Sequence, residues 1–245
     1  MAHALLLIHA FPVDARMWDP QRSALEGAIP VVAPHLPGFG GTEPPGEVMT
    51  MAAAAERCLS ALDEVGADRA VVCGLSIGGY VAFEIWRRAR HRVAGLVLAN
   101  TRPGADTDEG VANRRALAER LRAEGNAFLV ESPGPLLSAG ASEELWSRVR
   151  SWVADQPAEA IAAASLGMAE RPDSTPDLAG IDVPTVVVTG SADTLIAPEV
   201  SSPMAEQIPG AELVVLEGAG HLSNVEAPDA FTDVLRELID RAGVR

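Results

Sequence analysis

The sequence predicts an α/β protein: a mostly parallel, doubly wound sheet of about six strands with a helical segment inserted into it. Two observations carry this prediction. Short apolar runs rich in branched residues recur along the 245 residues, and each is followed by a turn that contains Gly or Pro. Such runs without polar alternation are typical of strands covered on both faces, as in a parallel sheet. Helical patterns separate most of the runs, and this alternation is typical of doubly wound sheets.

The predicted strands are Leu5–Ile8, Ile29–Ala33, Ala70–Cys73, Val93–Ala99, Pro184–Thr189 and Leu213–Leu216. We predict helices over Thr50–Val65 and Ile77–Arg90, and another close to the C-terminus. In that last helix apolar residues fall at i, i+3, i+4, i+7 and i+8, which makes a stripe that faces a core. They are Phe231, Val234, Leu235, Leu238 and Ile239.

One region breaks the alternation, because no convincing strand pattern occurs from Gly104 to about Leu178. The segments Glu109–Glu124, Ala141–Asp155 and Pro157–Ala169 are all predicted to be helices. We therefore expect a core formed by residues 1–103 and 179–245 and a helical cap, or lid, formed by residues 104–178. The alternative at this point is a helical hairpin on the surface, packed away from any site.

Composition excludes several classes of partner and cofactor. The formal net charge is −15 and no basic run occurs, which argues against nucleic acid and against anionic membranes. The chain has no lysine, so no Schiff base can form on that side chain. Two cysteines, Cys58 and Cys73, have neither metal-ligand nor disulfide spacing. We therefore predict no metal and no cofactor.

The beginning of the chain gives an expectation about location. The apolar start "ALLLIHAF" is too short to span a bilayer and follows no cationic segment. A cytoplasmic protein is expected. The sequence leaves open whether the chain forms a homo-oligomer.

Ser76 is the candidate nucleophile. It lies in "GLSIGG", between a predicted strand and a predicted helix, with Gly74 two residues before it and Gly78 two residues after. A serine on so sharp a turn has a positive φ and needs small neighbours at those two positions. The pattern alone can arise by coincidence, so the rest of the chain must decide. In this context the backbone N–H of Ile77 would point into the site from the first helical turn.

A serine hydroxyl needs an adjacent base, and the candidate is His221. It follows the predicted strand Leu213–Leu216 in "EGAGH"; the alternative, for this residue taken alone, is an exposed loop histidine. Asp193 in "TGSAD" follows the strand Pro184–Thr189 and is the candidate for orienting the imidazole; alone it would be an ordinary turn aspartate. Three such residues at three strand ends, in the order Ser, Asp, His, indicate a catalytic triad.

The loop "HAFP" after the first predicted strand is the candidate for the remaining part of the site, the oxyanion hole. Acyl transfer needs two N–H donors that face the developing oxyanion. Since Pro12 has no N–H, we expect Phe11 to donate from this loop together with Ile77. We expect His9 to orient the loop rather than to act as the base.

The motifs that carry these residues resemble those of the α/β-hydrolase superfamily, in its capped serine carboxylesterase and 3-oxoadipate enol-lactonase-like branch. They are "LLLIHAFP", "MWDP", "APHLPGFGGT", "GLSIGGY", "TGSAD" and "GAGHLSNVEAP", which run from Leu5 to Pro228. The resemblance implies an α/β-hydrolase fold and the same roles for the triad and the oxyanion hole. The chain departs from the family pattern at Ala10, where Gly is usual, and at His35, where Asp is common.

Three functional hypotheses follow. The favoured one is a serine hydrolase that cleaves a small carboxylic ester or lactone through an acyl-enzyme on Ser76. A cofactor-free haloperoxidase, in effect a perhydrolase, would use the same triad. A non-catalytic small-ligand receptor of the same fold is the third, and the presence of a complete triad argues against it.

The residues that select the substrate are the least defined. Candidates for an apolar acyl pocket in the cap are Trp146, Trp152, Phe128, Leu136 and Leu137, although aromatic and leucine residues on helices more often belong to a plain core. An arginine such as Arg16, Arg114 or Arg148 could bind a substrate carboxylate, which an enol-lactonase would require; each is also an ordinary surface residue by its pattern.

Overall fold

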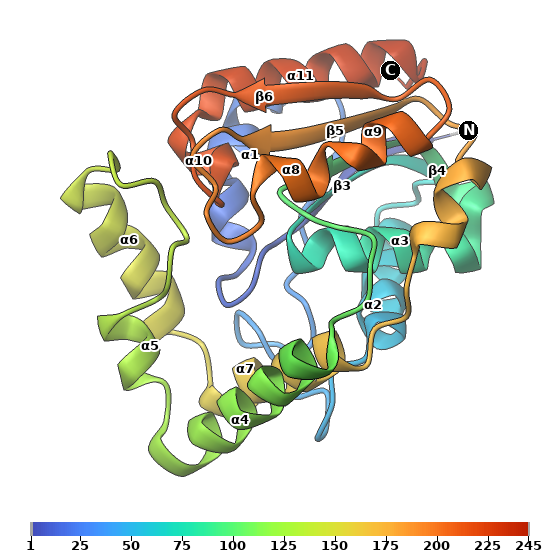
Figure 1. The fold of residues 1–245 in the computed structure, drawn as a ribbon. Coiled ribbons are helices and arrows are strands. Elements are labelled where there is room, and N and C mark those ends of the chain that lie inside the picture. The colour runs from blue at the N-terminus through green and yellow to red at the C-terminus, as the bar shows by residue number, and fades with distance from the viewer. Residues whose placement is uncertain (1, 245) are drawn as a thin grey trace.

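A six-stranded sheet forms the centre of the protein, seen in a computed structural model that describes residues 2–244 (Figure 1). Its strands are β1 (His3–Ile8), β2 (Val31–Val32), β3 (Arg69–Leu75), β4 (Val93–Ala99), β5 (Thr185–Gly190) and β6 (Glu212–Leu216). The strand order is β2-β1-β3-β4-β5-β6 and every neighbouring pair is parallel. The predicted parallel, doubly wound sheet is therefore confirmed. The order reverses between β1 and β3, and in open parallel sheets a crevice for ligands forms at such a point.

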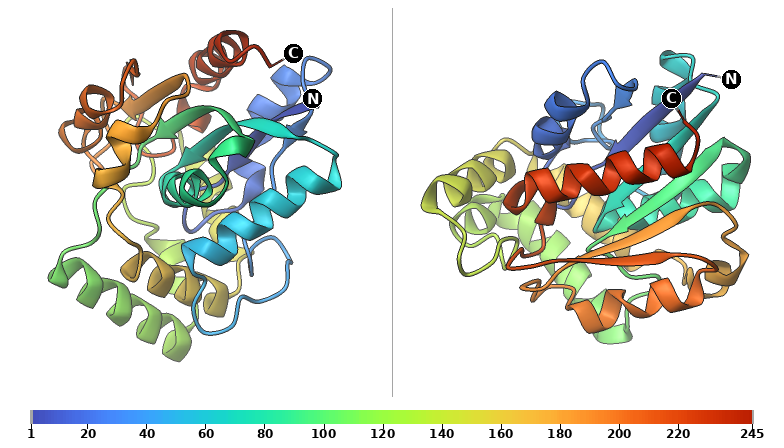
Figure 2. Two further views of the ribbon diagram at one scale, coloured as in Figure 1. Left: turned by 90° about the vertical axis from the view of Figure 1, so that its right-hand side faces the viewer. Right: turned by 90° about the horizontal axis from the view of Figure 1, so that it is seen from above.

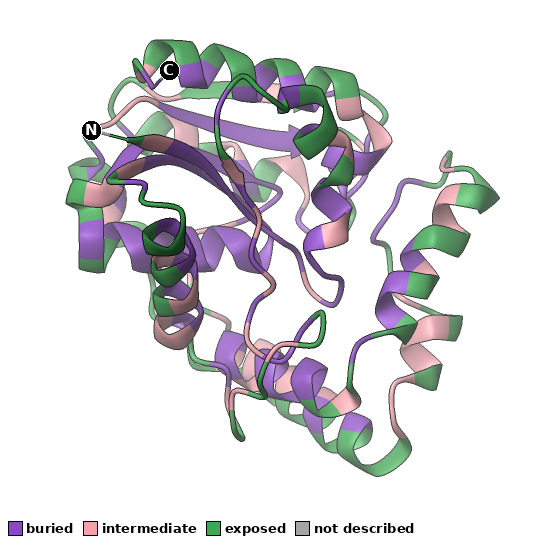
Figure 3. Cartoon of the chain, turned by 180° about the vertical axis from the view of Figure 1, so that it is seen from behind, coloured by how far each residue is buried: buried purple, intermediate pink, exposed green. Residues whose placement is uncertain are grey.

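Helices cover both faces of this sheet. On one face lie α1 (Asp19–Leu25) and α11 (Pro228–Arg241), and on the other α2 (Met51–Glu64) and α3 (Ile77–Ala89). Side chains alternate along each strand, so Leu5 and Leu7 pack on the first face while Leu6 and Ile8 pack on the second. The inner strands are buried along their length, as the purple strands in Figure 3 show. The predicted stripe of α11 is buried against the sheet.

Between β4 and β5 the chain forms four helices, which we call the cap: α4 (Asp108–Glu124), α5 (Ala127–Glu131), α6 (Glu143–Ala154) and α7 (Ala158–Ala169). The side chain of Thr107 accepts a hydrogen bond from the backbone of Gly110 and starts α4; Ser142 starts α6 in the same way. In Figure 1 the arrowheads of β5 and β6 point toward the side on which α6 lies. The cap therefore lies beyond the carboxyl ends of the strands.

The remaining elements are short, and most lacked a sequence signal. They are η1 (Ala15–Trp18), η2 (Arg90–Arg92), η3 (Thr175–Gly180), α8 (Pro198–Ser201), α9 (Pro203–Gln207) and α10 (Ser223–Glu226). Helices of one or two turns, α1 and α5 included, show too little periodicity to be predicted. The strand predicted over Ile29–Ala33 is only two residues long, because β2 is an edge strand and Pro30 offers no N–H to the ladder.

The two ends of the described chain lie near each other (Figure 2). Among residues 2–244 the structure contains no helix with the length and hydrophobicity that a membrane span requires.

Candidate active site

The turn between β3 and α3 holds Ser76 in a strained conformation. Its φ is 58° and its ψ −115°, a region that residues other than glycine rarely adopt. The neighbouring glycines make this turn sterically feasible. A Cβ on Gly74 would lie 2.1 Å from the carbonyl oxygen of Gly78, and a Cβ on Gly78 would lie 2.2 Å from that of Ile8. Both clashes are with backbone, which cannot move aside. The spacing of glycines around Ser76 thus has a steric cause.

Hydrogen bonds fix Ser76 to the end of the adjacent strand. Its backbone N–H donates to the carbonyl oxygen of Ala99 at 2.9 Å, and its carbonyl oxygen accepts from the hydroxyl of Thr101 at 2.8 Å. The side chain of Thr101 also occupies the space where a Cβ on Gly79 would lie, 2.4 Å away. The position of Ser76 is therefore set by β3, β4 and the first turn of α3 together.

His221 and Asp193 form a buried pair at the ends of β6 and β5. The Nδ1 atom of His221 lies 2.9 Å from Oδ2 of Asp193, and neither side chain is exposed to solvent. The other oxygen, Oδ1 of Asp193, accepts from the backbone N–H groups of Leu195 and Ile196, both at 2.9 Å. The structure therefore brings together two of the three predicted triad members.

The charge on Asp193 determines the tautomer of His221. Burial opposes the ionised carboxylate, but hydrogen bonds from His221, a neighbouring amide and the Ile196 N–H outweigh it, so the pKa of Asp193 lies below its ordinary value. An ionised carboxylate can only accept, so Nδ1 of His221 must carry the proton that it donates. In a neutral imidazole the free lone pair is then on Nε2.

The Nε2 atom of His221 is buried, and no group in residues 2–244 forms a hydrogen bond with it. Ser76 is thus not hydrogen-bonded to His221 in this structure. Catalytic hydrogen bonds of this kind are often long or poorly aligned until substrate binds. A buried, unpaired acceptor is costly, and the geometry leaves it available to a hydroxyl proton.

Asn100 supports Asp193 and was not among the residues predicted from the sequence. It follows β4 with a φ of 45°, and its Nδ2 donates to Oδ2 of Asp193 at 2.9 Å. Its Oδ1 accepts from the hydroxyl of Ser223 at 2.6 Å, which fixes the orientation of the amide. The signal was present, because Asn100 is a polar residue directly after a buried apolar strand, as Ser76 is.

The two predicted oxyanion donors lie on adjoining segments. The close approach of Gly78 to the carbonyl of Ile8 packs the start of α3 against the loop after β1, which carries Phe11. Within residues 2–244 neither the backbone N–H of Phe11 nor that of Ile77 donates a hydrogen bond to another group. Phe11 and Ser76 line the same cavity. Both N–H groups therefore remain available as donors.

Two other histidines stabilise the surrounding loops. His9 is buried, which lowers its pKa to about 4 and keeps the ring neutral. Its Nε2 accepts from the backbone N–H of Leu36 at 3.0 Å, so Nδ1 donates to the carbonyl of Ala10 at 2.9 Å. His35 accepts from the N–H of Ala15 at 3.3 Å. Both histidines join the loop after β1 to the loop after β2.

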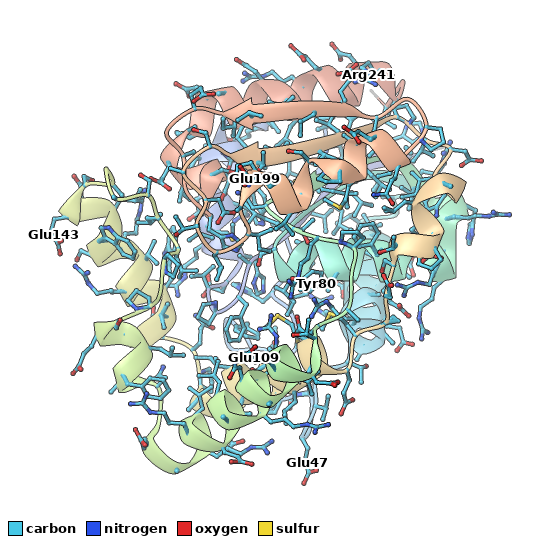
Figure 4. The ribbon with its side chains drawn as sticks, viewed as in Figure 1. Glu47, Tyr80, Glu109, Glu143, Glu199 and Arg241 are labelled. Carbon is cyan, nitrogen blue, oxygen red and sulfur yellow. The ribbon has the colours of Figure 1, made fainter. Side chains whose placement is uncertain are left out.

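A cavity of about 270 Å³ opens above Ser76, between the sheet and the cap. It is lined by Phe11, Pro12, Ser76, Tyr80, Arg102, Arg114, Leu129, Pro133, Gly134, Pro135, Leu136, Met168, Leu195 and Ile196. Figure 4 labels Tyr80 between α3 and the cap helix α4. Ligand pockets usually start at about 300 Å³, so this cavity suits a small molecule.

The cap loop that forms one wall of the cavity is tied to the loop of His221. The carbonyl of Leu136 accepts from the N–H of Leu222 at 2.8 Å. The carboxylate of Glu226 accepts from the hydroxyl of Ser138 at 2.6 Å and from the N–H of Gly220 at 2.7 Å. The wall of the cavity and the position of His221 are consequently coupled.

Within residues 2–244 no cluster of three or more His, Cys, Asp or Glu side chains could hold a metal ion.

Residues 5–234, nearly the whole chain, match a family described as the alpha/beta hydrolase family. The chain belongs to this family. Both the fold and the family expected from the motifs are thereby confirmed.

Named relatives of this hydrolase cover most of its length. It is 29% identical over 237 residues to 3-oxoadipate enol-lactonase 1 of Acinetobacter baylyi, which covers 95% of this chain and 87% of the relative. It is 27% identical over 249 residues to the pimeloyl-(acyl-carrier protein) methyl ester esterase of Aeromonas hydrophila, with coverages of 96% and 94%. A solved thermophilic esterase from Thermogutta terrifontis, with malate bound, superposes with a TM-score of 0.94 at 39% identity, covering 99% of this chain and 90% of that one.

The aromatic residues predicted for the acyl pocket of this hydrolase do not line the cavity at Ser76. Trp152 is a buried residue of α6, with the guanidinium of Arg148 5.6 Å from its ring. Phe128 lies under the guanidinium of Arg120 at 3.7 Å, and Trp146 is a partly buried residue of α6. These side chains hold the cap together. Residues of the cap loop between α5 and α6 line the cavity instead; among them is Leu136, which was a candidate from the sequence, whereas Leu137 does not line it.

Proposed function

We propose that this hydrolase cleaves small carboxylic esters or lactones through an acyl-enzyme on Ser76. His221 acts as general base and then general acid, Asp193 orients it, and the backbone N–H groups of Phe11 and Ile77 bind the oxyanion. The observation that carries the proposal is Ser76, held at positive φ at the floor of a cavity, with a buried His221–Asp193 pair on the neighbouring strand ends. The names of the relatives, an enol-lactonase and methyl ester esterases, support the same chemistry.

The reaction balances in two halves. The Ser76 hydroxyl attacks the carbonyl carbon while its proton passes to Nε2 of His221, and the carbonyl becomes an oxyanion. When this intermediate collapses, the C–O bond to the leaving group breaks and His221 returns the proton to that oxygen. In a lactone the leaving oxygen remains attached to the acyl group. A water molecule then attacks the acyl-enzyme, gives its proton to Nε2, and Ser76 recovers that proton as the acid is released.

A series of p-nitrophenyl esters with increasing acyl length tests the proposed function. Because the cavity measures about 270 Å³, we expect kcat/KM to be highest for acetate to butyrate and to fall by about tenfold or more at decanoate. Release of p-nitrophenolate is followed by absorbance. A small unstrained lactone, followed by proton release, serves as the second substrate. A folded protein that hydrolyses neither the esters nor the lactone contradicts the proposed function.

A further inference from the structure

The charged residues that line the cavity at Ser76 all have the same sign. Arg102 and Arg114 are the charged members of its wall, and no acidic residue accompanies them there. Arg102 follows Thr101, whose hydroxyl binds the carbonyl of Ser76, and Arg114 belongs to the cap helix α4. The cavity therefore has a nucleophile from the core and cationic side chains from both the core and the cap.

These arginines belong to a cluster with an excess of positive charge. The carboxylate of Asp106, whose side chain is 2% exposed, pairs with three guanidinium groups. They come from Arg102, from Arg114 at 2.8 Å and from Arg171 at 2.9 Å. Burial works against its charge, but the bonds to Arg171 and Arg114 prevail, so the pKa of Asp106 is held far below its usual range. One negative charge thus faces three positive charges.

The arginines differ in how many of their donors are already used. Arg171 is buried and both of its Nη atoms are used: besides Asp106 it donates to the carbonyls of Met168 and Gly104, and it stacks 4.1 Å from the ring of Tyr80. Arg114 uses only its Nε on Asp106, and Arg102 uses only its Nη2. Within residues 2–244 the Nη atoms of Arg114 and the Nη1 of Arg102 have no acceptor. The Nε of Arg171 also lacks an acceptor but is buried, whereas Arg102 and Arg114 line the cavity at Ser76.

We propose that Arg102 and Arg114 form an anion subsite, and that the preferred substrate is a small ester or lactone carrying a carboxylate at the end remote from its reacting carbonyl. A guanidinium presents a fork of N–H donors that fits a carboxylate. The small volume requires that the anionic group and the reacting carbonyl belong to one short molecule. A monoester of a short dicarboxylic acid has this chemistry. The inference rests on the proposed function, because Ser76 must attack the ester while the arginines hold the carboxylate.

Two methyl esters of matched shape test the subsite. Monomethyl glutarate carries a carboxylate, and methyl 5-amino-5-oxopentanoate carries a neutral amide in its place. We expect the wild-type protein to hydrolyse the former with a kcat/KM at least about tenfold higher, mainly through a lower KM. In Arg114→Gln this ratio falls to near one, because the substitution removes the guanidinium that distinguishes the carboxylate from the amide.

Arg115→Gln is the matched control, because Arg115 lies next to Arg114 on α4 and does not line the cavity. It removes the same charge and is expected to keep the preference of the wild-type protein. A purely structural role for Arg114 in fixing the cap would lower the rates on both esters alike. Equal rates on the two esters in the wild-type protein, or an unchanged ratio in Arg114→Gln, overturn the proposal.

Binding of glutarate, measured by calorimetry, separates the subsite from the chemistry. We expect glutarate to bind the wild-type protein and Arg115→Gln alike and to bind Arg114→Gln at least about tenfold more weakly. If neither ester is hydrolysed but this pattern of binding holds, the proposed function fails and the anion subsite stands. If esters are hydrolysed but glutarate does not bind, the subsite fails and the proposed function stands.

Discussion

Replacement of Ser76 by alanine is expected to lower kcat for p-nitrophenyl butyrate by about 10⁴-fold or more, to a rate set by the remaining oxyanion donors. The substitution removes the nucleophile's oxygen and leaves the backbone bonds of residue 76 to Ala99 and Thr101 in place. Since both residue types carry a Cβ, the strain at a φ of 58° is unchanged. The free energy of unfolding should therefore differ little between the two proteins.

Ser151→Ala is the matched control for this measurement. Ser151 is an exposed serine on the cap helix α6, and it does not line the cavity. Initial rates and urea unfolding curves are measured for the wild-type protein and both variants. The control is expected to keep full activity. A folded Ser76→Ala protein that retained more than a few per cent of the wild-type rate would remove Ser76 from the mechanism.

Asp193→Asn is expected to lower kcat by about 10³- to 10⁴-fold while the protein remains folded. The N–H groups of Leu195 and Ile196 both point at Oδ1, so the asparagine must keep its oxygen at that position. Its NH₂ group then replaces Oδ2 and faces His221 as a donor. The imidazole is driven to the tautomer protonated on Nε2, which cannot accept the Ser76 proton. The same NH₂ group also opposes the donor of Asn100.

The comparison uses kcat from pH 6 to pH 9, together with nitrogen-15 NMR of the imidazole. Asp233→Asn is the control, because Asp233 is exposed on α11 and forms a surface pair with Arg236. Its kcat should match that of the wild-type protein, since surface pairs contribute little. A decrease of less than tenfold in Asp193→Asn, with Nε2 of His221 still unprotonated, would show that Asp193 does not set the tautomer.

The sequence predicted the parts of the candidate site that lie at strand ends. The glycines around Ser76 were informative because their absent Cβ atoms leave room for backbone oxygens. Asp193 and His221 followed apolar runs, buried in β5 and largely exposed in the edge strand β6, and in a parallel sheet the ends of such runs meet at one edge. The pairing of His221 with Asp193 is a direct consequence of β5 and β6 being neighbours.

Apart from the candidates Leu136 and Arg114, the wall of the cavity could not be predicted in the same way. The residues from Pro133 to Leu136 form a loop without periodicity, and only the tertiary contact between Leu136 and Leu222 places it above Ser76. Nor did the sequence distinguish Arg114 from the two other candidate arginines. In the structure Arg16 binds Asp14, and Arg148 lies over an aromatic ring. Asn100 was missed because its contacts join segments far apart in the chain.

Covalent capture of the nucleophile tests the central claim most directly. Diethyl p-nitrophenyl phosphate reacts with an activated serine: its oxygen bonds to phosphorus, p-nitrophenolate leaves, and the diethyl phosphoryl group remains on the protein. We predict release of one equivalent of p-nitrophenolate, loss of esterase activity in parallel, and a phosphoryl group located on Ser76 by peptide mass spectrometry. Complete inactivation with the label on another residue, or full esterase activity without any label, would contradict an acyl-enzyme on Ser76.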